Sequence, residues 1–265
     1  MAIAVAGHAS GWPIPRGGSQ KIADSLAGYF RSLGGEIVPS HKVTELPQSP
    51  LVMCDISPHQ LLALASGKLP ASYGRSLEAF RYGPGVFKLD WALEAPVPWR
   101  APECARAGTI HLGGTFDEIA MWERSFTGAP FVLAAQPSLF DSSRAPRDRH
   151  TLWAYCHVPG GSGVDMTAAI EAQVERFAPG FRSRILARAV ESPADLEHGD
   201  ANLIGGAVTG GMNDLRQTFF RPTPGLYRTP LRGVFLCSAS TPPGGGVHGM
   251  CGFHAARWAL RSVRG

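Results

Sequence analysis

The residues best suited to chemistry lie near the end of the chain, where a short apolar segment precedes a glycine-rich turn. Residues 234–237 are typical of a buried strand, and residues 249–261, rich in alanine, predict a helix. Three consecutive glycines at 244–246 lie between them. Glycine lets the backbone approach a ligand, and the first turn of a helix offers N–H groups and a partial positive charge. The pattern predicts a ligand site, although ordinary turns also place glycine before helices.

His248 stands at the start of the predicted helix. An acid/base role is one interpretation, because imidazole titrates near neutral pH. The alternative, which we favour, is a backbone hydrogen bond through which His248 caps the loop. Cys251 with His254, and Cys156 with His157, lack the four ligands of a structural zinc site, so we assign them to packing and expect no metal. The absence of a Gly-x-Ser-x-Gly segment disfavours a serine hydrolase of that type.

Composition indicates a globular protein with a substantial core. The chain has 265 residues, of which 44% are hydrophobic and 17% charged. The net charge of +4 is spread without long runs of like charge, which disfavours nucleic acid as a partner. Five widely spaced cysteines favour reduced thiols and a cytoplasmic location. The apolar run at residues 1–9 is too short for a signal peptide, and no run approaches a membrane span, so we expect neither.

The first part of the chain has an α/β pattern. Ser19 is the expected N-cap of a helix that ends at Gly34. Apolar residues recur every four positions in it, which predicts one buried face containing Ile22, Leu26 and Phe30. Residues 36–38 and 42–44 predict short strands, and the apolar run 51–55 predicts a covered, parallel strand. A capping box with proline at the first helical position then predicts a helix at Ser57-Pro58-His59-Gln60 and beyond.

From Tyr82 the pattern changes to longer strands with alternating polarity. Residues 86–93 have the period of a half-buried strand. We also expect strands at 109–112, 131–135 and 151–158, helices at 116–126 and 166–177, and a glycine-rich loop at 202–212. Aromatic residues on strands more often form core than a pocket, but both interpretations stand for Trp91, Trp99, Trp153 and Tyr155. This part is typical of an antiparallel sheet with helices.

The closing segment resembles the C-terminal FAD-binding segment of the phytoene desaturase-like branch of the flavin amine oxidoreductases. The match runs from Leu-Cys-Ser-Ala-Ser through Pro-Pro-Gly-Gly-Gly-Val-His-Gly-Met to Cys-Gly-x-His-Ala-Ala, with support from Trp12-Pro-x-Pro-Arg-Gly-Gly-Ser-Gln20 and Tyr82-Gly-Pro-Gly-Val-Phe-Lys-Leu-Asp-Trp91. It implies FAD as cofactor, an apolar small-molecule substrate and hydride transfer to the flavin. The implied cofactor-binding residues in this segment are Ser238, Ala239, Gly244, Gly245, Gly246, Val247, His248, Gly249 and Met250.

The resemblance also implies that the backbone N–H and C=O of Val43, on the strand at 42–44, hold the adenine. It implies that the free N–H groups of Gly249 and Met250 point into a cleft. Because the family shares no general base, we assign no catalytic residue.

The implied fold is α/β with an α+β insertion. A split FAD-binding domain at residues 1–72 and 222–265 surrounds a mixed, largely antiparallel substrate-binding domain at residues 73–221. The family opens with a strand, a Gly-x-Gly-x-x-Gly turn and a helix, followed about twenty residues later by an acidic residue for the ribose, and this sequence has no such unit. We therefore expect a truncated C-terminal portion that does not hold FAD alone and needs an N-terminal segment or a homodimer partner. The competing hypothesis is a non-catalytic binding or regulatory module.

Overall fold

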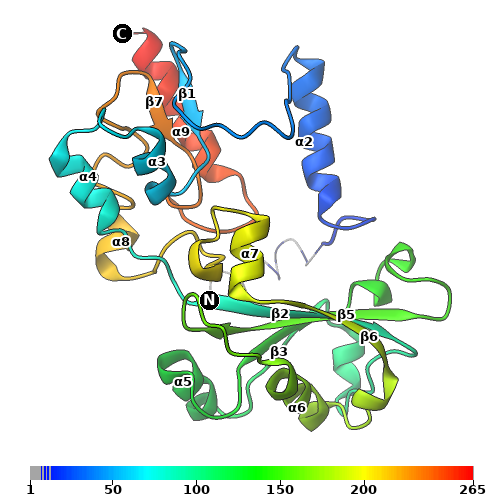
Figure 1. Ribbon diagram of the computed structural model, residues 1–265. Coiled ribbons are helices and arrows are strands. Elements are labelled where there is room, and N and C mark those ends of the chain that lie inside the picture. Colours follow the sequence, from blue (N-terminus) through cyan, green and yellow to red (C-terminus); the bar gives the residue numbers. More distant parts are fainter. Residues whose placement is uncertain (1–6, 8, 10, 12, 265) are drawn as a thin grey trace. The chain divides into compact units, whose positions relative to one another are not determined.

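The computed structural model describes residues 7, 9, 11 and 13–264. Trp12 and most of the apolar N-terminus, at 1–6 and 8, lie outside the described residues. The chain divides into two compact units, which we describe separately. Unit 1 comprises Met1–His41, Lys88–Cys156 and Met166–Val190; unit 2 comprises Lys42–Phe87, His157–Asp165 and Glu191–Gly265. The fold is mixed α/β with parallel and antiparallel strands (Figure 1), as predicted, whereas the split domain with boundaries at 72 and 221 stays a prediction.

Unit 1 holds most residues of a five-stranded sheet in the order β3-β4-β5-β2-β6. Antiparallel pairing joins β3 to β4 and β4 to β5. All the strands except β6 were predicted; β6 forms one edge of the sheet, and its mostly exposed residues show no alternation that a sequence pattern could reveal. The strands are β2 (Gly85–Leu93), β3 (Thr109–Leu112), β4 (Val132–Ala135), β5 (His150–Val158) and β6 (Ile185–Glu191).

Helices α5 (Phe116–Ser125) and α6 (Thr167–Phe177) lie on the same side of this sheet (Figure 1). Ile170 and Val174 of α6 are fully buried, as the predicted apolar stripe requires. The predicted alternation in β2 is also confirmed, because Phe87, Leu89, Trp91 and Leu93 are all at most 2% exposed. Trp91 is therefore a core residue: it contacts the ring of Phe181 edge to face and donates its Nε1–H to Glu171 of α6 at 3.1 Å.

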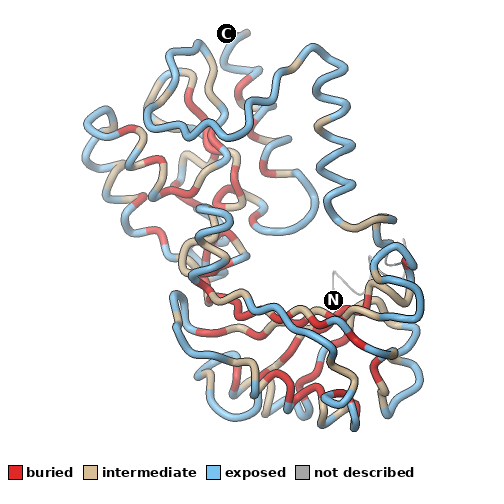
Figure 2. The backbone as a smooth tube through the Cα atoms, turned by 45° about the vertical axis from the view of Figure 1, so that its right-hand side comes forward, coloured by how far each residue is buried: buried red, intermediate tan, exposed pale blue. Residues whose placement is uncertain are grey.

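Helix α2 (Gln20–Ser32) forms where the sequence predicts it and ends before Gly34, which has a left-handed φ of +87°. The expected buried face is wrong. Ile22, Leu26 and Phe30 are 41%, 66% and 49% exposed, and Figure 2 shows the tube exposed along nearly all of α2. An apolar stripe is buried only where another element covers it, and the described residues supply no cover here. Ser19 is the N-cap residue, as predicted, but its side chain makes no capping hydrogen bond.

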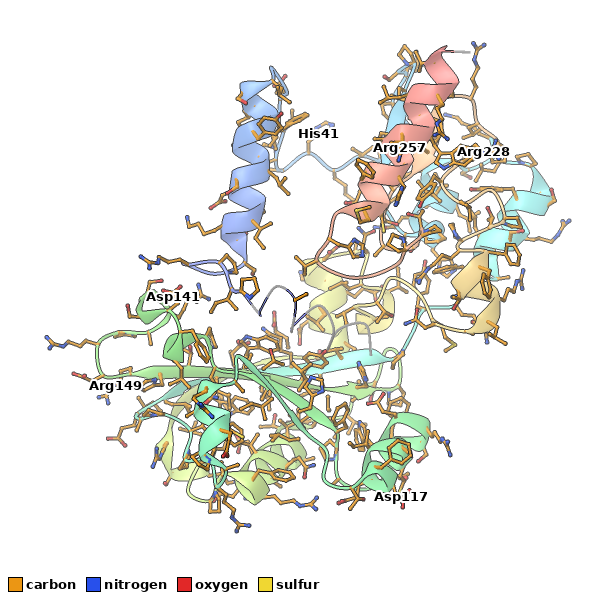
Figure 3. The ribbon with its side chains drawn as sticks, turned by 180° about the vertical axis from the view of Figure 1, so that it is seen from behind. His41, Asp117, Asp141, Arg149, Arg228 and Arg257 are labelled. Carbon is orange, nitrogen blue, oxygen red and sulfur yellow. The ribbon has the colours of Figure 1, made fainter. Side chains whose placement is uncertain are left out.

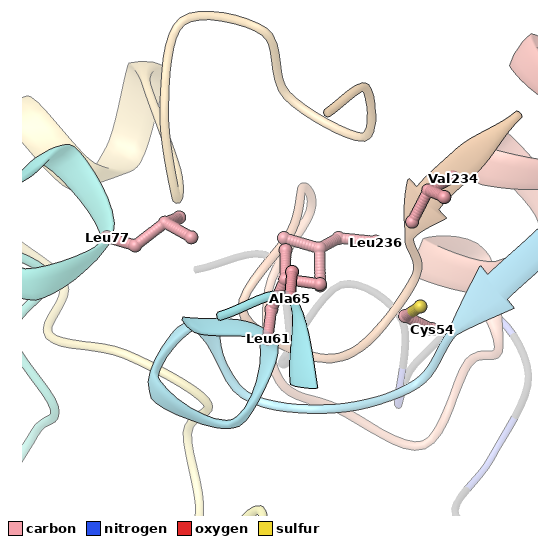
Figure 4. Close-up of a cluster of buried hydrophobic side chains, with 6 residues drawn as sticks. All are labelled: Cys54, Leu61, Ala65, Leu77, Val234 and Leu236. Atoms are coloured by element: carbon pink, nitrogen blue, oxygen red, sulfur yellow. The ribbon is translucent and has the colours of Figure 1, made fainter. Parts of the chain in front are cut away.

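Unit 2 contains two short parallel strands, β1 (Val52–Cys54) and β7 (Val234–Leu236). Helix α3 (Pro58–Leu64) begins with the predicted capping box between Ser57 and Gln60. The remaining helices are α4 (Ala71–Glu78), α7 (Pro193–Gly199), α8 (Leu215–Phe219) and α9 (Met250–Arg264). One apolar cluster (Figure 4) joins the strands to α3 and α4: Cys54, Leu61, Ala65, Leu77, Val234 and Leu236. This cluster fixes the ends of β1 and β7, from which the site described below is built.

The strands expected at 36–38 and 42–44 are wrong, because both segments are irregular. A strand needs a hydrogen-bonded neighbour, and in the described part of the chain β1 pairs with β7 rather than with either segment. Val43 is 51% exposed. The loop expected at 202–212 is confirmed, apart from one 3-10 turn at Ile204–Gly206. Helices α4, α7 and α8 were not predicted. None of the helices within the described ranges has the length and hydropathy of a bilayer span.

Candidate functional site

A cavity of about 400 Å³ lies in unit 2, at the carboxyl ends of β1 and β7. Parallel strands commonly present ligand sites at this edge. After β7 the chain turns back through hydrogen bonds from Thr241 N–H to Ser238 C=O and from Gly244 N–H to Thr241 C=O, each 2.9 Å long. This turn brings six of the residues singled out in the sequence around the cavity: Ser238, Ala239, Gly244, Gly246, His248 and Gly249.

Four other residues singled out in the sequence do not line this cavity. Gly245 packs against the backbone of Thr209, where an added Cβ would lie 2.8 Å from the carbonyl oxygen. The Val247 side chain is 92% exposed. Met250 begins α9, and Val43 lies on the irregular segment before β1. The contacts of these residues with a cofactor stay predictions.

His248 caps helix α9. Its Nδ1 accepts a hydrogen bond from the backbone N–H of Met250 at 3.0 Å, which confirms the interpretation we favoured. An acceptor at Nδ1 places the proton of the neutral ring on Nε2. The N–H of Met250 is therefore not free, which corrects the expectation that it points into the cleft. The other first-turn N–H groups, which lack intrahelical acceptors, belong to Cys251 and Gly252, and both residues line the cavity.

Two cysteines line the cavity without offering a nucleophile. The buried Sγ of Cys251 lies 3.4 and 3.3 Å from the carbonyl oxygens of Thr241 and Gly244, which share its single S–H, and so ties α9 to the glycine-rich loop. This is the packing role that we expected for it. Desolvation, with added repulsion from Asp55, raises the pKa of the Cys237 thiol to about 12, so it stays protonated near neutral pH.

A cluster of oxygen atoms on the cavity wall was not predicted from the sequence. The Nδ2 of Asn202 donates to the carbonyl of Asp55 at 3.0 Å, and its backbone N–H donates to the Asp200 carboxylate at 2.9 Å. Desolvation, together with the charge of Asp200, raises the pKa of Asp55. The buried Oδ1 of Asn202 has no partner among the described residues. The position of Asp55 at the carboxyl end of a predicted parallel strand is the signal that would have found this cluster.

Unit 1 has a smaller cavity, of about 230 Å³, and one of the four aromatic residues considered in the sequence, Trp153, lines it. Thr109, Ala135 and Trp153 form one row across β3, β4 and β5 and line it. Asp141, labelled in Figure 3, accepts a hydrogen bond from the backbone N–H of Gly17 at 2.6 Å. This bond holds the loop that precedes α2 beside Asp141. The structure thus gives two of the four aromatic residues different environments: Trp91 lies in the core and Trp153 lines a cavity. Whether Trp153 contacts a substrate stays a prediction.

The sequence is similar to known oxidoreductases, although no family model matches it. Pyridine nucleotide-disulfide oxidoreductase domain-containing protein 2 of Mus musculus is 40% identical over 253 residues, which cover 87% of this chain and 43% of that protein. A 4,4'-diapolycopen-4-al dehydrogenase of Metabacillus indicus is 31% identical over 128 residues, 44% of this chain and 25% of that enzyme. The chain thus spans less than half the length of these relatives.

A solved structure extends the similarity to the fold. An oxidoreductase from Methanosarcina mazei superposes with a TM-score of 0.62 at 15% identity, covering 95% of this chain and 55% of that one. The chain shares its fold with oxidoreductases. At this identity the superposition shows similarity of fold alone. Because 95% of the chain is covered, residues of both units are part of the superposition.

Proposed function

We propose that this chain is the cofactor- and substrate-contacting part of an FAD-dependent oxidoreductase of the phytoene desaturase-like kind. One observation carries the proposal: six residues implied by the sequence resemblance line a single cavity at the carboxyl ends of β1 and β7. The oxidoreductase relatives support a redox function, and the diapolycopen-4-al dehydrogenase among them supports an apolar substrate. When bound, FAD would accept a hydride from that substrate.

The residues of the cavity fit part of a flavin nucleotide. A volume of about 400 Å³ is at the small end of the range of about 300–1,000 Å³ that is typical of ligand pockets. The first-turn N–H groups of Cys251 and Gly252 and the positive end of the α9 dipole suit an electron-rich ring edge. Ser238, Ala239 and Gly244 line the cavity from the loop between β7 and α9, and would contact the cofactor from that loop. His248 would fix the start of α9 rather than transfer a proton.

The test is flavin binding to a variant in which the cavity is filled. Gly252 lines the cavity, and a Cβ added there meets no atom within 4 Å. Gly252→Leu therefore fills the cavity without backbone strain. The control is Ala256→Leu, one turn later on the exposed side of α9. We expect the full-length chain to purify without flavin and to bind added FAD weakly. Gly252→Leu should weaken this binding at least about tenfold, and Ala256→Leu should not.

Fluorescence quenching of FAD gives the affinities, and amide NMR spectra of the chain give the location. Saturating FAD should shift the resonances of Cys251 and Gly252. Equal FAD affinity in Gly252→Leu and Ala256→Leu would contradict the proposal. So would unchanged amide resonances of Cys251 and Gly252 at the highest FAD concentration that can be reached.

Further parts of the proposal concern the rest of the enzyme. An N-terminal segment, or a second copy of the chain, would supply the missing dinucleotide contacts, since the one Gly-x-Gly-x-x-Gly spacing in the sequence, at 244–249, has no acidic residue after it for the ribose. The cytoplasmic location stays a prediction. The non-catalytic alternative has no observation of its own in its favour.

A further inference from the structure

Arg221 is a buried arginine with weak hydrogen bonding. It follows α8 and is only 3% exposed. Its Nη1 donates to Oδ1 of Asn213 at 3.4 Å and its Nη2 to the carbonyl of Thr209 at 3.5 Å, both near the limit for a hydrogen bond. Its Nε is buried and has no partner among the described residues. Neutral acceptors at such distances compensate little of the cost of burying a charge.

The guanidinium lies directly behind the cavity wall, because two glycines make room for it. A Cβ on Gly244 would lie 2.6 Å from Nη1, and a Cβ on Gly211 would lie 2.5 Å from Nη2. Gly244 lines the cavity, and so does Gly210, the neighbour of Gly211. Any larger residue at either glycine would displace the guanidinium. Both loops therefore depend on Arg221, and both contribute to the same cavity.

The nearby carboxylate of Asp214 does not compensate this charge directly. It forms an ion pair with the exposed Arg81 and accepts the backbone N–H of Gln217 at 2.9 Å. The charge of Asp214 acts on Arg221 only from beyond hydrogen-bonding distance. It raises the pKa of Arg221, but desolvation has the larger effect and lowers that pKa. A buried guanidinium without an adjacent anion is costly, and an anion nearby would reduce that cost.

The cavity has other features that bear on an anion. The N-terminal end of α9 favours negative charge, whereas the carboxylates of Asp55 and Asp200 repel it. A positive charge behind Gly244 offsets that repulsion. We propose that Arg221 provides the positive charge that attracts an anionic ligand group, of the phosphate or diphosphate class, to the wall formed by Gly244 and Gly246, and that it positions this wall. The inference rests on the proposed function only in taking this cavity as the ligand site.

The experiment titrates the full-length chain with inorganic pyrophosphate, and calorimetry gives the affinity. Arg221→Met removes the charge, and Arg221→Lys keeps it. Arg228→Met is the control: Arg228, labelled in Figure 3, is exposed, lies over the ring of Trp258 and does not line this cavity. We expect wild type and Arg228→Met to bind pyrophosphate alike, Arg221→Met to bind at least about tenfold more weakly, and Arg221→Lys to stay within about threefold of wild type.

Three results would overturn the inference. They are equal affinity in Arg221→Met and Arg228→Met, an affinity of Arg221→Lys as low as that of Arg221→Met, and no binding of pyrophosphate to wild type. The second would mean that the arginine only packs. These results concern pyrophosphate, so they are independent of the Gly252→Leu result, which tests the flavin site.

A measurement on the wild-type chain covers the case in which Arg221→Met does not fold. The Nε–H resonance of Arg221 can be assigned by its disappearance in Arg221→Lys. Pyrophosphate should shift this resonance, because the buried Nε–H reports the charge placed near it. Backbone amides of the cavity that shift while this resonance stays fixed would equally overturn the inference.

Discussion

The thiol of Cys251 donates a hydrogen bond to the carbonyl of Gly244 at 3.3 Å and thereby joins the first turn of α9 to the glycine-rich loop. The same sulfur contacts the carbonyl of Thr241 at 3.4 Å. The two walls of the cavity are therefore linked by one side chain. Any ligand that enters meets a loop and a helix already fixed to each other, which lowers the entropic cost of binding.

Cys251→Ala should destabilise unit 2, because the buried carbonyl of Gly244 loses its thiol donor, whereas the carbonyl of Thr241 still accepts the N–H of Gly244. The loss of a donor to buried acceptors costs about 1–3 kcal/mol. Cys251→Ser keeps a donor of similar size and should cost less. Urea unfolding followed by circular dichroism measures both, with Cys104→Ala, in unit 1, as control. Equal stability of Cys251→Ala and wild type would show that the thiol does not hold the loop.

His248→Ala should loosen the start of α9 without affecting the rest of the chain. The lost side chain is the acceptor for the Met250 N–H, and losing a helix cap costs about 1 kcal/mol. Amide hydrogen exchange should show faster exchange at Met250. His41→Ala, which removes an exposed histidine in a different part of the chain (Figure 3), is the control and should leave that rate unchanged. An unchanged exchange rate at Met250 in His248→Ala would contradict the capping role.

The ion pair of Glu118 with Arg176 should make unit 1 sensitive to acid. Hydrogen bonds from Arg176 and from the backbone of Thr115 lower the pKa of Glu118 from 4.5 to about 2. Because the folded-state value is the lower one, its contribution to stability is complete above about pH 4.5 and is lost as the pH falls towards 2. Glu118→Gln should be less stable than wild type at neutral pH, and the difference should shrink across that interval.

Urea midpoints measured from pH 7 to pH 2 test the acid sensitivity. Asp117→Asn is the matched control, because it removes an exposed carboxylate from the same helical turn (Figure 3). A difference between wild type and Glu118→Gln that stays constant over the whole interval would show that the ion pair does not form in solution.

Local patterns predicted much of the fold. The alternation in β2 is set by which residues can face a core, and the capping box at Ser57 is satisfied within four residues of chain. The features that failed depend on contacts across the chain. Residues 42–44 have strand-like composition, but a strand exists only where another strand pairs with it.

The candidate site shows the same division. The closing motif marks the glycine-rich loop and α9, which lie within one short stretch of sequence. Arg221 and Asn202 contribute through contacts with residues distant in the chain or with loop backbone, as in the bond from Asn202 to Asp55. No spacing rule marks such residues. A buried guanidinium becomes visible only when the two glycine loops around it are placed.

The exposed apolar stripe of α2 should tolerate a charge. Leu26 is 66% exposed, so Leu26→Glu should change the free energy of unfolding by no more than about 0.5 kcal/mol. Leu89→Ala, at a fully buried position in the same unit, should cost about 2–5 kcal/mol. Urea unfolding gives both values, and analytical ultracentrifugation gives the mass of each variant. A loss of more than about 1 kcal/mol in Leu26→Glu, or a dimeric wild type that becomes monomeric in this variant, would show that a second copy covers the stripe in solution.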